Sequence, residues 1–218
     1  MRESIASAEG AITIQPSIVM LGEGEHARQF EELVDEGTVQ NAFDRLGKSL
    51  VEHLGEELEE GEQPVGLCVM KGGMFATMGI ARVMREEGMP IKYDTVELKS
   101  YGNDVTSSGI VHLKKDYEVD VKGRPVVIFD DLLDSCLTVN HLIQRTQHRG
   151  ARSITVITLL DKPDAHRVTL PKDVTVFTGM SVSADEFVVG CGMDYREEGR
   201  ELPAIYTARR DYLENPDA

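Results

Sequence analysis

The residues best suited to chemistry follow the most β-like run of the chain, residues 125–129. Residues 134–138 carry one carboxylate and the hydroxyls of Ser135 and Thr138, and they lead into a stretch that we expect to be helical. Backbone N–H groups in the first turn of a helix lie at the positive end of its dipole, where they favour an anion. The segment 134–138 is therefore predicted to hold a phosphate monoester.

Two adjacent carboxylates, Asp130 and Asp131, end the same apolar run. Such a pair can accept hydrogen bonds from the two hydroxyls of a ribose, and it can equally position a divalent cation between sugar and phosphate oxygens. The carboxylates alone do not choose between these uses.

Short apolar runs, several of them followed by helical periodicity, extend over most of the chain. This pattern is typical of buried parallel strands joined by crossover helices. The expected strands are 65–70, 91–98, 125–129, 154–160, 174–177 and 187–190. We therefore predict an α/β fold with a twisted, mainly parallel sheet flanked by helices, and a site beyond the carboxyl ends of its strands. Residues 100–109 are polar and rich in Ser and Gly, and we interpret them as a mobile flap.

The composition argues against several classes of function. A formal net charge of −15 argues against extended binding of nucleic acid. No run approaches the roughly 20 apolar residues of a membrane helix, and the polar N-terminus does not read as a signal peptide, so we expect a cytoplasmic protein without a membrane partner. The 3 cysteines have no CxxC spacing and are expected to be reduced and buried.

The negative charge is concentrated in residues 22–63, which hold 13 acidic and 3 basic residues, a net charge of −10. Apolar residues at spacings of three and four place one face of an expected helix in the core there. We interpret the acidic face as solvated, in preference to a cation or partner site.

The order of residues 126–138 resembles the phosphoribosyl-pyrophosphate motif of the purine phosphoribosyltransferases. Further stretches match the hypoxanthine-guanine branch of that family in the same order. They are 66–73, 98–104, 159–163, 187–190 and 193–195, with Arg200. The resemblance covers about residues 40–208. It implies the type I phosphoribosyltransferase fold, with a small hood and a mobile flap, over residues 39–218, and it leaves 1–38 as an N-terminal extension without an assigned function.

In that family a 6-oxopurine base displaces pyrophosphate from phosphoribosyl pyrophosphate with the help of Mg²⁺, and IMP or GMP is formed in purine salvage. The resemblance assigns Asp134 as the general acid/base that faces purine N7. It assigns the 5′-phosphate to Asp134, Ser135, Cys136, Leu137 and Thr138. It assigns Asp130 and Asp131 to the ribose and the first Mg²⁺, and Asp194 to a second Mg²⁺.

The remaining assignments also rest on the resemblance. Pyrophosphate is assigned to Met70, Lys71, Gly72 and Arg200, and the family often has a cis peptide before this lysine. The flap pair is Ser100 and Tyr101. The purine site is assigned to Lys162, Phe187, Val188 and Asp194. In it, the lysine donates to the 6-oxo group, the phenylalanine stacks on the ring, and the backbone of the valine contacts the pyrimidine edge.

Cys136 departs from the family, which has glycine at this place in the phosphate loop. If the backbone here needs a positive φ, cysteine strains the loop by roughly 1–2 kcal/mol and weakens substrate binding. If φ is negative, the cost is small. A helix N-terminus could also lower the pKa of the thiol and make it oxidisable, although an inert thiol is the simpler interpretation.

Two functions remain open at this point. The first is an enzyme of purine salvage that acts on phosphoribosyl pyrophosphate and a 6-oxopurine, as the homodimer or homotetramer usual in the family. The second is a non-catalytic regulator on the same scaffold, which binds phosphoribosyl pyrophosphate or a nucleotide. The acidic chain has no basic helix-turn-helix pattern, which favours the enzyme.

Overall fold

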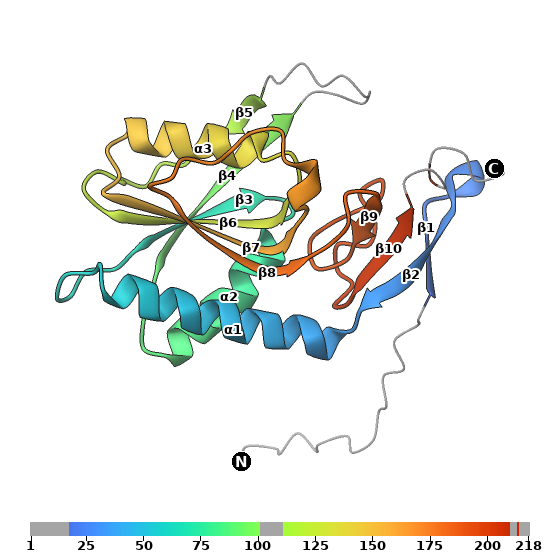
Figure 1. Ribbon diagram of the computed structural model, residues 1–218, viewed down its shortest axis with the longest axis horizontal. Coiled ribbons are helices and arrows are strands. Elements are labelled where there is room, and N and C mark those ends of the chain that lie inside the picture. The colour runs from blue at the N-terminus through green and yellow to red at the C-terminus, as the bar shows by residue number, and fades with distance from the viewer. Residues whose placement is uncertain (1–17, 101–110, 210–212, 214–218) are drawn as a thin grey trace, which may run out of the picture.

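The central sheet forms the body of the protein (Figure 1). The computed structural model describes residues 18–100, 111–209 and 213. Six strands follow the order β5-β4-β3-β6-β7-β8, and all neighbours are parallel except β4 and β5. Their bounds are β3 (Val65–Met70), β4 (Lys92–Ser100), β5 (Val111–Lys115), β6 (Pro125–Leu133), β7 (Ser153–Asp161) and β8 (Thr175–Ser181). The predicted parallel α/β sheet is confirmed.

Helices cover both faces of this sheet (Figure 1). The helices α1 (Glu36–Gly55) and α2 (Met74–Glu86) pack on one face, and α3 (Leu137–His148) packs on the other. The face of α1 that contacts the core carries the apolar residues of the acidic segment, including Val39, Leu46 and Leu50. Two short 3-10 helices, η1 (Gly24–His26) and η2 (Pro163–Ala165), complete the helical elements of the described residues. No helix in this part of the chain is long and apolar enough to cross a membrane.

A second, four-stranded antiparallel sheet, which we call the hood, lies beyond the carboxyl ends of the parallel strands (Figure 1). Its order is β1-β2-β10-β9, with bounds β1 (Ile18–Leu21), β2 (Arg28–Val34), β10 (Ile205–Arg209) and β9 (Glu186–Val189). The strands β1 and β2 come from the predicted N-terminal extension, yet β2 pairs with β10 from the other end of the chain. The domain boundary at residue 38 stays a prediction, and the described residues before it take part in the hood.

The strand β6 is longer than its apolar run. It continues through Leu133, so that Asp130 and Asp131 lie within the strand, paired with the last part of β7, and not after its end. The side chain of Asp130 is buried, whereas Asp131 is only partly buried. Pairing with a neighbouring strand satisfies the backbone here, which allowed the strand to extend past the last apolar residue.

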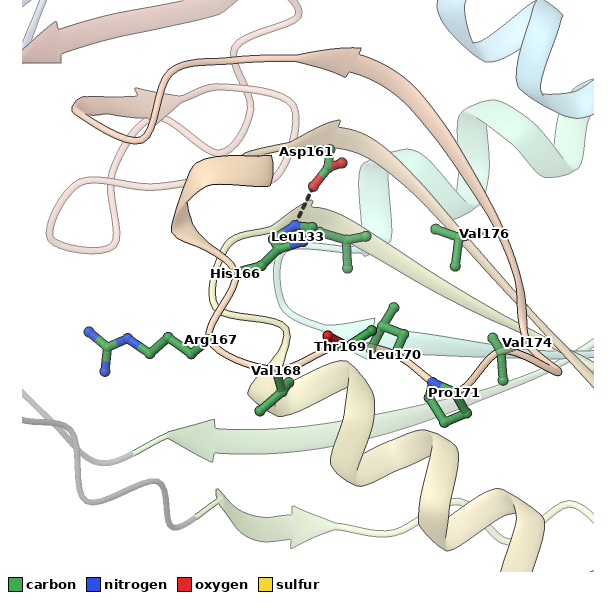
Figure 2. Close-up of a pocket in the computed structure, with 10 residues that line it drawn as sticks. All are labelled: Leu133, Asp161, His166, Arg167, Val168, Thr169, Leu170, Pro171, Val174 and Val176. Atoms are coloured by element: carbon green, nitrogen blue, oxygen red, sulfur yellow. Dashed lines mark hydrogen bonds and ion pairs between the residues drawn. The ribbon is translucent and has the colours of Figure 1, made fainter.

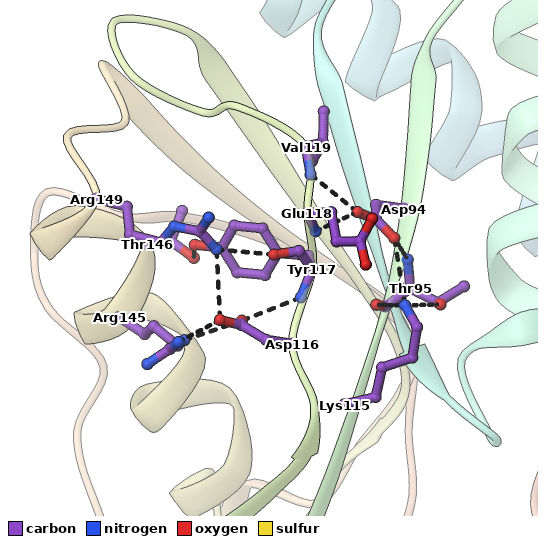
Figure 3. A network of polar contacts seen from close by, with 10 residues as sticks. All are labelled: Asp94, Thr95, Lys115, Asp116, Tyr117, Glu118, Val119, Arg145, Thr146 and Arg149. Carbon is purple, nitrogen blue, oxygen red and sulfur yellow. Dashed lines mark hydrogen bonds and ion pairs between the residues drawn. The ribbon is translucent and has the colours of Figure 1, made fainter.

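Hydrogen bonds and ion pairs link the connection between β5 and β6 to α3 (Figure 3). Arg145 donates from Nε to Oδ1 of Asp116 over 3.0 Å and forms an ion pair with the other oxygen. Arg149 stacks its guanidinium 4.1 Å from the ring centre of Tyr117, whose buried hydroxyl donates to Thr146. The helix that begins at the phosphate loop is thereby held at its far end.

We predict that Asp116→Asn lowers the free energy of unfolding by about 1 kcal/mol at neutral pH, because the carboxylate is partly exposed and partly screened. The hydrogen bond from Arg145 holds the pKa of Asp116 below its usual 3.8. Because the folded state favours the ionised carboxylate, this group stabilises the fold above pH 3.8. The contribution is lost as the pH falls below 3.8 and through the lowered pKa of the folded state. Urea unfolding at neutral pH and at about pH 3 measures both effects.

The exposed Glu118 on the same connection provides the control, because Glu118→Gln removes a charge of the same sign. A loss of stability in Asp116→Asn that is as large at low pH as at neutral pH would contradict the role of the ion pair.

Candidate active site

The phosphate loop, residues 134–138, joins β6 to α3. Cys136 is the residue before the helix, and its carbonyl accepts a hydrogen bond from the N–H of Asn140 over 2.9 Å. The hydroxyl of Ser135 lies 3.5 Å from the N–H of Leu137, to which it is hydrogen-bonded. The start of α3 therefore lies within this loop, and the loop combines N–H groups with two hydroxyls, which are the donors that an anion site requires. The carboxylate of Asp134 begins the same loop.

The backbone at Cys136 has a positive φ, which is the strained one of the two conformations described above for this residue. Its φ is 62° and its ψ is 1°, in the left-handed region that favours glycine. The side chain is buried. Burial, followed by the charges of Asp161 and Asp134, raises the pKa of its thiol to about 11. The lowered pKa considered as an alternative is therefore wrong, because burial and these carboxylates act against the thiolate.

Asp130 and Asp131 form an acidic pair that favours a bound cation. Burial and then the charge of Asp131 raise the pKa of Asp130 well above its ordinary value. A Cβ on Gly72 would lie 1.9 Å from Oδ2 of Asp131, so the backbone of the loop after β3 passes directly over this carboxylate. Two adjacent carboxylates with little access to water are costly unless a cation or hydrogen-bond donors compensate them.

These carboxylates fit Mg²⁺, which usually takes one or two protein carboxylates and completes its shell with water and substrate phosphates. No group of three or more acidic, histidine or cysteine side chains converges within the described residues. Asp194, the predicted second ligand, accepts hydrogen bonds at one oxygen from Glu197 N–H and forms an ion pair at the other with Arg200 at 2.6 Å. Its role toward metal stays a prediction.

The loop after β3 and the loop after β9 meet at the predicted pyrophosphate residues. The peptide bond between Met70 and Lys71 is cis, as the resemblance implied. A Cβ on Gly192 would lie 2.0 Å from the carbonyl oxygen of Gly72, so a side chain there would prevent this approach of the two backbones. Arg200 donates to the carbonyl of Gly192 over 2.7 Å, which fixes its guanidinium at the same junction.

Glu197, which was not among the predicted site residues, connects the two predicted pyrophosphate cations. One of its oxygens lies 2.6 Å from Nζ of Lys71 and 3.4 Å from Nη2 of Arg200. In the sequence it is one of several acidic residues in an apparently ordinary turn, 126 positions from its lysine partner, so no local signal could have found it.

Lys162 is the most deeply buried charged residue of the predicted site, with 1% of its side chain exposed. Its Nζ donates to the carbonyl oxygen of Glu186 in the hood over 2.6 Å and lies 3.7 Å from Oδ2 of Asp134. Its backbone N–H donates to Leu133 over 2.8 Å. The ammonium therefore lies between the phosphate loop and the strand that carries Phe187 and Val188.

Phe187 and Val188 follow the residue that accepts from Lys162, in β9. The partly buried Phe187 ring lies 6.1 Å from the ring of Tyr195 and 6.3 Å from that of Phe30, whereas Val188 is buried against the main core. No local pattern in the sequence links Phe30 to Phe187, because β2 lies in the predicted extension. An aromatic residue directly after the carbonyl that accepts from a buried ammonium is suited to a flat base with a polar edge.

The flap stays a prediction. Ser100 is the last residue of β4, but its side chain and the whole of Tyr101 lie outside the described residues.

A cavity of about 430 Å³ lies beside the phosphate loop (Figure 2). Its wall includes Leu133 and the pair formed by Asp161 and His166, whose Oδ1 and Nε2 are 2.7 Å apart. Arg167 donates its backbone N–H to the carbonyl of Ser135 and so closes the side toward the loop. No predicted substrate residue lines this cavity, and we do not assign it to the substrates.

Comparisons with known proteins identify the family of this chain. The family model for the phosphoribosyl transferase domain matches residues 37–196. The hypoxanthine-guanine phosphoribosyltransferase of Crithidia fasciculata is 33% identical over 185 residues, which cover 84% of this chain and 87% of that protein. The enzyme of the same name from Bacillus subtilis (strain 168) is 38% identical over 71% of this chain and 84% of its own length.

Solved structures agree with the fold. The hypoxanthine phosphoribosyltransferase from Trypanosoma cruzi, in complex with the product IMP, superposes with a TM-score of 0.72 at 27% identity and covers 88% of this chain and 99% of that one. The hypoxanthine phosphoribosyltransferase from Staphylococcus aureus gives 0.70 at 28% identity over 82% of this chain and 91% of that one. The type I phosphoribosyltransferase fold is thus confirmed, and the chain belongs to the phosphoribosyltransferase family, in its hypoxanthine-guanine branch.

Proposed function

We propose that this protein transfers the phosphoribosyl group of phosphoribosyl pyrophosphate to N9 of hypoxanthine or guanine, with release of pyrophosphate, in purine salvage. The observation that carries the proposal is the buried ammonium of Lys162 between the phosphate loop and β9. A fixed cationic donor at this place suits the 6-oxo group of a purine held against Phe187.

The reaction requires the base and the sugar to be held in line while negative charge grows on the departing pyrophosphate. We assign the 5′-phosphate to the loop 134–138, which supplies N–H groups and two hydroxyls at the start of α3. Lys71 and Arg200 take the pyrophosphate oxygens. Asp134, whose carboxylate lies 3.7 Å from the Lys162 ammonium, accepts the proton of purine N7 as N9 forms its bond to C1. The bond between C1 and the pyrophosphate oxygen breaks, and its electron pair leaves with pyrophosphate.

We assign Mg²⁺ to the acidic pair Asp130 and Asp131, and to Asp194 for a second ion. When bound, the metal neutralises charge on the pyrophosphate. The protein's own contribution is to hold the ribose hydroxyls at the same pair and to bring the loop of Gly72 against it. Ser100 and Tyr101 are assigned to a flap that excludes water from the reacting centre.

Three further proposals rest on the sequence and on the family resemblance. They are a cytoplasmic location, a homodimer or homotetramer, and a catalytic domain over residues 39–218, which includes the hood strands β9 and β10.

The function is tested by mixing the purified protein with Mg²⁺, phosphoribosyl pyrophosphate and each purine base in turn. We expect IMP from hypoxanthine or GMP from guanine, little product from adenine, and loss of turnover when the metal is chelated. Chromatography of the nucleotides measures all of these. Binding of phosphoribosyl pyrophosphate without any nucleotide product would favour the non-catalytic regulator.

We predict that Cys136→Gly lowers the KM for phosphoribosyl pyrophosphate, by up to about tenfold, because glycine adopts the positive φ of this position without the cost of about 1–2 kcal/mol. Steady-state kinetics with the base in excess measures the change. The matched control is Cys136→Ala, which removes the thiol but keeps the Cβ and so keeps the strain. Equal KM values for the glycine and alanine variants would show that the strain does not act on substrate binding.

A further inference from the structure

Glu197 lies on a turn with an unusual backbone. Arg196 and Glu197 are consecutive non-glycine residues with φ values of 54° and 69°. The turn is closed by mutual backbone hydrogen bonds of 3.0 Å between Tyr195 and Glu198, and the N–H of Glu197 donates to Asp194 over 2.7 Å. Left-handed conformations of such residues are costly and persist where surrounding contacts compensate for them. The turn therefore fixes the direction in which the Cα–Cβ bond of Glu197 leaves the backbone.

This side chain contacts the two cations that we assign to pyrophosphate. Its Oε2 lies 2.6 Å from Nζ of Lys71 and 3.4 Å from Nη2 of Arg200. The two cations come from different loops, one after β3 and one after β9, and a single carboxylate oxygen contacts both. The hydrogen bond from Lys71 lowers the pKa of Glu197, so the group is a carboxylate at neutral pH.

The contact is not needed to hold the arginine. Arg200 already forms an ion pair with Asp194 at 2.6 Å and donates to the carbonyl of Gly192 over 2.7 Å. The side chains of Lys71 and Glu197 are 55% and 65% exposed. Exposed ion pairs contribute little stability, so an anion of higher charge can replace the carboxylate.

We propose that the carboxylate of Glu197 competes with the pyrophosphate group for Lys71 and Arg200. This proposal rests on the function proposed above. One carboxylate oxygen takes the place that a pyrophosphate oxygen would take between the two cations. Glu197 then weakens binding of phosphoribosyl pyrophosphate slightly, and it takes over the cations as the product pyrophosphate leaves. The residue is a positioning residue that affects substrate affinity and product release.

The test is Glu197→Gln, which keeps the size of the side chain and removes its charge. Calorimetric titration of the full-length protein with inorganic pyrophosphate and Mg²⁺ should give a Kd about two- to fivefold lower than that of the wild type. The difference should fall toward zero at about 1 M salt, where the screening length is about 3 Å. A role confined to the shape of the turn would not produce a salt-dependent gain.

The matched control is Glu201→Gln, which removes an exposed carboxylate four positions further along the same segment and should leave the Kd unchanged. In turnover, Glu197→Gln should lower the KM for phosphoribosyl pyrophosphate and strengthen inhibition by pyrophosphate, whereas kcat should stay the same or fall as release slows. A Kd for pyrophosphate equal to or higher than that of the wild type would overturn the proposal. Failure of the wild type to form nucleotide would instead overturn the proposed function, so the two failures are distinguishable.

Discussion

The ammonium of Lys162 joins three parts of the molecule. It extends from the segment after β7 of the central sheet, donates to Glu186 in the hood and faces Asp134 in the phosphate loop. A charge with 1% of its side chain exposed is costly unless hydrogen bonds and an opposite charge compensate it. The hood, the loop and the sheet must therefore keep their positions relative to one another around this ammonium. The place where they meet is the purine site that we propose.

The same dependence on local pairing explains how an acidic protein can bind a polyanion. The net charge is −15, and residues 22–63 contribute −10 of it, mostly from acidic residues in the segments just before and just after α1. The proposed anion site lies elsewhere, where the loops after β3, β6 and β9 converge with their N–H groups, Lys71 and Arg200. Within the site, the electrostatic potential depends on these few groups and on a bound cation. The overall negative charge therefore disfavours binding of extended nucleic acid more than binding of a small phosphate.

The sequence was informative where a residue type and its neighbours along the chain determine the structure. Apolar runs predicted the parallel strands of the central sheet, although the run 187–190 belongs to the antiparallel hood, and the order of Asp130 to Thr138 located the loop before α3. It was uninformative where residues far apart in the chain pair. Tertiary packing determines the pairing of β2 with β10 and the contact of Glu197 with Lys71. The geometry at the start of α3 determines the positive φ of Cys136. The extension of β6 past Phe129 depends on its neighbour β7, which compensates for two polar residues in a strand.

The most direct test of the central role of Lys162 is the ratio of kcat/KM for hypoxanthine to kcat/KM for adenine, measured in the wild type and in Lys162→Met. Methionine keeps much of the side-chain volume but cannot donate to a 6-oxo group. The ratio should fall by at least about a hundredfold, since a site that hydrogen-bonds a polar group discriminates strongly against a base without it. An unchanged ratio in a variant that remains folded would contradict the assignment of this buried ammonium to the purine.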